Sequence, residues 1–209
     1  MAEYETATVA ARDASVFGTP PAHPLEVIRG WFDDARELGV PECGAMALAT
    51  ADAHGRSSAR MVHVIEVRAD ALIFTTHRHS QKGREIDETQ WSSGVLYWRE
   101  TKQQITVAGP TRLVSTEVSD ALWGRRPLTT NAMSFVSRQS APLEDEAALR
   151  DEANALLAAS LGLPRPDGWV GYAIYPQIVE FWHAAPDRLH QRLRYEQDGR
   201  GWNWRRLQP

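Results

Sequence analysis

Three basic side chains near the end of the chain have a spacing that suits ligand binding. Arg188, His190 and Arg192 occupy alternate positions, and alternate residues of a β-strand point to the same face. Two guanidinium groups and an imidazole on one face can bind a planar anion such as a carboxylate or a phosphate. Trp182, six residues before Arg188, adds a flat apolar surface. The pattern predicts a ligand that is aromatic at one end and anionic at the other, and a solvated, charged strand face is the alternative.

A second segment has the character of a phosphate-binding loop. Thr75 and Thr76 end an apolar, strand-like stretch, and Ser80 and Lys82 follow it. Ser80 is expected to cap a helix, and the free backbone N–H groups at the start of a helix attract anions. An ordinary basic loop with a helix cap is the alternative.

Other polar residues carry weaker signals. Gln104 and the pair Gln139-Ser140 lie beside apolar runs, where amides and a hydroxyl can satisfy the rim of a flavin ring. His77 and His79 have no third metal ligand in view, so no metal is expected.

Composition and missing motifs exclude several classes of protein. The 209 residues suit one globular domain, and the net charge of -4 does not favour nucleic-acid binding. A single cysteine excludes an intrachain disulfide framework and a multi-cysteine zinc site. The chain has no dinucleotide-binding glycine motif, Walker loop or serine-hydrolase elbow. With no secretory signal and no apolar run of membrane-spanning length, we expect a soluble, cytoplasmic protein without a membrane partner.

The elements that must position these residues are mostly strands. We expect a flexible arm over residues 1–22 and one domain over 23–209, with Gly109-Pro110 marking a bulge or strand break. Leu189 and Leu193 should face the core. Short strands joined by sequential hairpins predict a mainly antiparallel β-barrel with helices. Helices are predicted at 24–39, 80–89, 116–124 and 143–161, and strands at 45–50, 57–67, 71–76, 95–98, 104–113, 169–175, 178–183, 189–196 and 202–207.

Taken in order, these motifs resemble the pyridoxamine 5′-phosphate oxidase family over roughly residues 25–209. The most specific part is Glu180-Phe181-Trp182 followed by Arg188-Leu189-His190-Gln191-Arg192. The resemblance implies an FMN-binding split β-barrel that works as a homodimer, with FMN between the subunits. It places Arg188 and His190 on the substrate side. It implies FMN contacts for Arg60, Met61, Val62, His63, Val64, Ile65, Thr75, Thr76, Ser80, Gln81, Lys82, Gln104, Gln139, Ser140, Trp182 and Arg192.

Departures from the family pattern concern the substrate. Ile65 stands where the family has a phosphate-binding Lys, and Ala121 stands where it has a Tyr. An Arg of the same site aligns with Arg125 or Arg126. The pocket is thus more apolar, which resembles the branch of the family that works in phenazine biosynthesis. That branch oxidises partly reduced tricyclic carboxylates.

The resemblance implies an oxidase that transfers hydride from a reduced phenazine carboxylate to FMN, with O2 giving hydrogen peroxide. Arg188 would hold the carboxylate, His190 would orient the substrate, and Arg192 would favour the reduced flavin. No obligatory acid or base is assigned. The alternatives are a true pyridoxamine or pyridoxine 5′-phosphate oxidase and a non-catalytic flavin-binding module.

Overall fold

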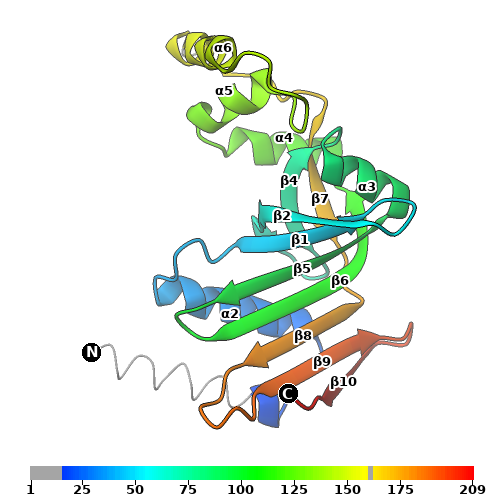
Figure 1. Ribbon diagram of the computed structural model, residues 1–209. Coiled ribbons are helices and arrows are strands. Elements are labelled where there is room, and N and C mark those ends of the chain that lie inside the picture. The colour runs from blue at the N-terminus through cyan, green and yellow to red at the C-terminus, as the bar shows by residue number, and fades with distance from the viewer. Residues whose placement is uncertain (1–15, 160–161) are drawn as a thin grey trace.

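The computed structural model describes residues 16–159 and 162–209, and its centre is an antiparallel β-sheet (Figure 1). One path of paired strands runs in the order β10-β9-β8-β6-β5-β1-β2. A second group, β3, β4 and β7, joins this path through the pairing of β7 with β6. The strands are β1 (Ala45–Ala51), β2 (Ser57–His63), β3 (Glu66–Val67), β4 (Leu72–His77), β5 (Trp91–Trp98), β6 (Gln103–Leu113), β7 (Trp169–Ile174), β8 (Ile178–His183), β9 (Gln191–Gln197) and β10 (Trp202–Arg206).

Helix α2 lies against the sheet and closes the main core (Figure 1). Pro24 begins the helix, and its apolar face is buried. Trp31 packs edge-on against Phe181 of β8, with ring centroids 5.1 Å apart, and Phe32 packs in the same way on Trp98 of β5. The helices are α2 (Pro24–Glu37), α3 (Gln81–Thr89), α4 (Thr116–Gly124), α5 (Leu128–Val136) and α6 (Glu146–Ala158).

Strand β6 connects the two parts of the barrel. It pairs with β8 as far as Ala108 and with β7 from Thr111 onward. The predicted bulge or break at Gly109-Pro110 is wrong, because β6 stays paired with β5 through both residues. Only glycine fits at position 109, where a Cβ atom would lie 2.1 Å from the carbonyl oxygen of Tyr175. The two residues therefore mark the point where one continuous strand changes its partner.

The barrel is open between β2 and β4. Residues 57–67, predicted as one strand, form two: β2 pairs with β1, and β3 pairs with β4. The chain changes sides between them, where the N–H of Ile65 donates to the carbonyl of Ile73 at 2.8 Å. Among the strands of residues 16–159 and 162–209, none pairs with the second edge of β2.

Several boundaries differ from the predictions. Helix α5 was not predicted, β5 begins at Trp91 rather than at residue 95, and β9 begins at Gln191 rather than at residue 189. Of the expected arm, residues 1–15 lie outside the described residues. In the rest of that segment, Phe17 is 4% exposed and the hydroxyl of Tyr195 donates to the carbonyl of Pro21. Across the described chain, every helix is too short or too polar to cross a membrane.

Candidate functional site

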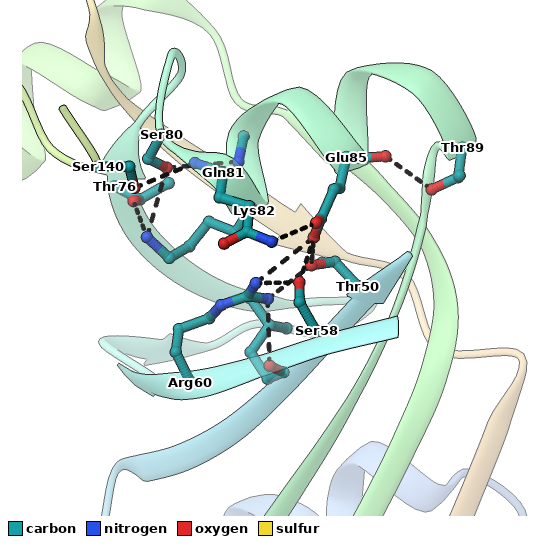
Figure 2. A network of polar contacts seen from close by, with 12 residues as sticks. Thr50, Ser58, Arg60, Thr76, Ser80, Gln81, Lys82, Glu85, Thr89 and Ser140 are labelled. Atoms are coloured by element: carbon teal, nitrogen blue, oxygen red, sulfur yellow. Dashed lines mark hydrogen bonds and ion pairs between the residues drawn. The ribbon is translucent and has the colours of Figure 1, made fainter. Parts of the chain in front are cut away.

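A buried ammonium group lies where strand β4 leads into helix α3 (Figure 2). Lys82 is 6% exposed, and its Nζ atom donates to Thr76 Oγ1 at 3.2 Å, Ser80 Oγ at 3.3 Å and Gln139 Oε1 at 3.2 Å. All three acceptors are neutral. Burial, and then the charge of Arg60, lower the pKa of Lys82 to about 8. The charge of Glu85 offsets the cost of burying this cation only in part, so an anion would stabilise the arrangement.

The start of α3 adds backbone donors beside that ammonium. Ser80 caps the helix, as predicted, and its side chain accepts from the N–H of Gly83. The N–H of Gln81 donates to Ser140 Oγ at 3.2 Å. Gly83 is needed here because a Cβ atom would lie 2.0 Å from the carbonyl oxygen of Arg78. A helix start and a buried Lys together suit a phosphate group.

Arg60 is held beside this cluster by a second network, and it lies below the cluster in the view of Figure 2. Its guanidinium donates to Thr50 Oγ1 at 2.6 Å and to Ser58, and it lies 3.4 Å from Glu85 Oε2. Glu85 also accepts from Thr50, Ser58 and Gln81. Burial alone would raise the pKa of Glu85, but these hydrogen bonds and the charge of Arg60 outweigh it, so the pKa is lowered. Sequence reasoning missed Glu85, although its i,i+4 spacing from Gln81 is a usable signal.

The open edge of β2 lies next to these donors. Its residues alternate, with Met61 exposed and Val62 half-buried. Past the strand end, Val64 is buried and Ile65 is partly exposed. Backbone N–H and C=O groups on an unpaired strand edge can pair with the polar rim of a planar ring.

Three further predicted residues form a row across neighbouring strands. Gln104 of β6 is opposite Trp182 of β8, which is opposite Arg192 of β9. All three lie on the outer, half-exposed face of the sheet. The Trp182 ring also lies 4.9 Å from the ring of His190.

Within one chain, this row is far from Arg60 and the Lys82 cluster. Arg60 is on β2 and Arg192 is on β9, five strand steps apart in the sheet order, or about 24 Å along the sheet at roughly 4.8 Å per step. Figure 1 shows α3 and β9 at opposite ends of the sheet. If both groups contact one small ligand, two chains must supply them.

The prediction that Arg188, His190 and Arg192 lie on one strand face is wrong in its first part, because β9 begins only at Gln191. Arg188 has a φ of 67° and lies in a turn, and Leu189 is 68% exposed instead of facing the core. The cause is local, because the Asp187 carboxylate accepts from the N–H of Leu189 and prolongs the turn. His190 Nδ1 accepts from the N–H of Ala185 at 3.1 Å, which holds its ring beside Trp182.

Of the two alternative arginines, Arg126 has the geometry of a buried ligand contact. Its guanidinium lies 5.3 Å from the Trp123 ring centroid and 4.8 Å from that of Trp169. Within the described chain, its Nη1 atom is buried without a hydrogen-bond partner, and burial lowers its pKa. Arg125 instead forms a surface ion pair with Glu66. Ala121 is exposed on α4.

The charges of both Arg126 and Lys82 act on His77. Burial, and then the charges of His79, Arg126 and Lys82, lower the pKa of His77 to about 4. The surroundings are therefore positive, which favours a bound anion. In residues 16–159 and 162–209, no group of His, Cys, Asp and Glu side chains is arranged to hold a metal ion.

Comparison with known proteins gives two family matches and close relatives. A family model described as pyridoxamine 5′-phosphate oxidase matches residues 32–158, and the pyridoxine 5′-phosphate oxidase C-terminal dimerisation region matches residues 169–209. Dihydrophenazinedicarboxylate synthase of Pseudomonas chlororaphis is 45% identical over 190 residues, 91% of this chain and 86% of the relative. Pyridoxine/pyridoxamine 5′-phosphate oxidase of Mannheimia succiniciproducens is 36% identical over 188 residues, 89% of each chain.

A solved structure extends the similarity to the fold. PhzG from Burkholderia lata 383, in complex with tetrahydrophenazine-1-carboxylic acid, superposes with a TM-score of 0.91 at 45% identity, covering 93% of this chain and 96% of that one. The predicted mainly β, antiparallel split-barrel fold is confirmed.

Proposed function

This chain belongs to the pyridoxamine 5′-phosphate oxidase family, and from that premise we propose that it is an FMN-dependent oxidase of partly reduced phenazine carboxylates. The observation that carries the cofactor assignment is the buried Lys82 ammonium, which lies among neutral oxygens at the start of α3. The substrate assignment is supported by the 45% identity to dihydrophenazinedicarboxylate synthase. The family is one of flavin-binding proteins, and FMN in particular is part of this proposal.

The residues around Lys82 fit the phosphate end of FMN. Lys82 and Arg60 supply positive charge, Thr76 and Ser80 supply hydroxyl groups, and the first turn of α3 supplies backbone N–H groups. The open edge of β2 would face the ring. Thr75, Gln81, Gln139 and Ser140 complete the cluster that we assign to the cofactor.

A homodimer would bring the second group of residues to the cofactor. The matched C-terminal dimerisation region includes Trp182 and Arg192, which one chain alone holds far from Lys82. The outer face of the sheet carries a row of alanines on β1, together with Met61 at 62% exposure and Tyr97 at 55%. Exposed apolar surface of this kind is typical of an interface. We assign two equivalent sites, each built from both chains.

In the proposed mechanism, bound FMN would supply a two-electron acceptor, and O2 would be the final oxidant, giving hydrogen peroxide. The chain's own residues bind and orient the substrate. Arg188 and His190 would hold the carboxylate end, Trp182 would offer a flat surface, and Arg192 would place positive charge beside the cofactor. No side chain is assigned as an obligatory acid or base, because positioning a readily oxidised ring can suffice.

The proposed choice of substrate rests on three residues, Ile65, Ala121 and Arg126. Ile65 and Ala121 offer no charge or hydroxyl for a phosphate. Arg126 has an unpaired donor between two indole rings, which suits a carboxylate on a flat ring system. A bulky tricyclic carboxylate therefore fits better than a small phosphorylated pyridine.

The test is anaerobic mixing of the purified flavoprotein with candidate substrates. Reduced phenazine carboxylates should bleach the flavin absorption rapidly, and pyridoxamine 5′-phosphate should do so weakly or not at all. Efficient oxidation of pyridoxamine 5′-phosphate would instead support the alternative of a true pyridoxamine or pyridoxine 5′-phosphate oxidase. Bound FMN that no reduced substrate bleaches would point to a non-catalytic flavin module.

A further inference from the structure

Arg192 forms a close ion pair with Glu180 on the outer face of the sheet. Arg192 Nε donates to Glu180 Oε1 at 2.8 Å, and Nη2 lies 2.7 Å from the same oxygen. The strand register places Arg194, not Arg192, directly opposite Glu180. The carboxylate nevertheless makes only a 3.5 Å contact to Arg194. Glu180 therefore interacts mainly with its diagonal neighbour.

The last residues of the chain hold Arg192 from the other side. Its Nη1 atom donates to the carbonyl oxygen of Gln208 at 3.0 Å, and the N–H of Leu207 donates to the carbonyl oxygen of Arg192 at 3.1 Å. Figure 1 shows the C-terminal end beside β9. All three nitrogen atoms of the guanidinium group are thus engaged, so a side chain with many rotamers is held in one.

We propose that Glu180 is a positioning residue that acts through Arg192, fixing the guanidinium group where it meets FMN held by the partner chain. The proposal rests on the proposed function, which assigns Arg192 to the cofactor. A group that is already aligned loses less conformational entropy when the ligand binds. The negative charge of Glu180 acts against this gain, because it lowers the net charge beside an anionic cofactor. Position and charge therefore have to be separated by experiment.

A double-mutant cycle on the full-length dimer tests the proposal, with FMN dissociation constants measured by titrating the apoprotein. Glu180→Gln should weaken FMN binding about tenfold, the loss of one charge-assisted hydrogen bond. Glu180→Asp keeps the charge but shortens its reach, and it should weaken binding similarly. Glu196→Gln is the matched control: Glu196 pairs with Arg194 and Arg205 on the same face, and its loss should leave binding within about twofold.

The decisive comparison is between Arg192→Ala and the Arg192→Ala/Glu180→Gln double variant. If Glu180 acts through Arg192, the second substitution should add nothing to the first. Additive losses, wild-type binding by either Glu180 variant, or tighter binding by Glu180→Gln would overturn the proposal. If Arg192→Ala itself binds FMN normally, the assignment of Arg192 under the proposed function fails as well, which separates the two failures.

Discussion

Replacing Lys82 by Met removes the charge at the centre of the cluster that we assign to the FMN phosphate, and it retains an unbranched side chain. If Lys82 makes one charge-assisted hydrogen bond to the phosphate, its loss costs about 1.5–3 kcal/mol of binding free energy. FMN should then bind about ten- to hundredfold more weakly. Riboflavin, which lacks the phosphate, should bind both proteins alike. Titration of apoprotein with the two flavins measures the difference.

The same substitution should stabilise the protein without cofactor. The pKa of Lys82 falls from 10.5 to about 8 on folding, so the buried charge destabilises the apoprotein below pH 8 by about 3 kcal/mol as an upper estimate. Between about pH 8 and 10.5 the unfolded chain binds more protons than the folded one, so the stability of the wild-type apoprotein should rise with pH. Lys82→Met should be more stable near pH 7 and should lack this rise.

FMN binding should show the opposite dependence on pH. Above about pH 8 the apoprotein loses the Lys82 proton, so the wild-type dissociation constant should increase, by up to about tenfold per pH unit. Lys102→Met is the control, since Lys102 is exposed in the β5–β6 turn. Wild-type FMN affinity in Lys82→Met, or an unchanged pH profile, would refute the assignment of this cluster to phosphate.

Three other predictions concern the site and the fold. Arg188→Ala should slow flavin reduction by substrate while leaving FMN content near wild type, and Arg192→Ala should lower FMN retention; equal FMN loss in both would contradict the division of roles. Light scattering should give a dimer with two FMN per dimer, and a fully active monomer would exclude the shared site. Gly109→Ala should lower the free energy of unfolding by about 2 kcal/mol, because its Cβ atom would meet the Tyr175 carbonyl at 2.1 Å. Gly124→Ala, where no atom lies within 4 Å of the added Cβ atom, is the control in chemical denaturation.

The departures from prediction have two origins, one in long-range strand pairing and one in a local side-chain contact. The side-chain pattern of residues 57–67 is that of one strand, but the pairing of β2 with β1 and of β3 with β4 divides it. A turn prolonged by the Asp187 carboxylate keeps Arg188 out of β9. The alternation of side chains along the sequence predicts neither this division of the strand nor the hydrogen bond of Asp187.

Elements whose signals are local could be predicted from the amino-acid sequence. Ser80 caps α3 because its own side chain reaches the N–H of Gly83, three residues later. The spacing of Trp182 and Arg192 places them opposite one another once β8 and β9 pair. Which charges meet depends on the tertiary fold, in which Glu85 pairs with Arg60 and Glu180 pairs with Arg192. It also placed Arg192 of β9 five strand steps from Arg60 of β2. Those relations depend on strand order and register, which long-range packing sets and which neighbouring residues along the chain do not encode.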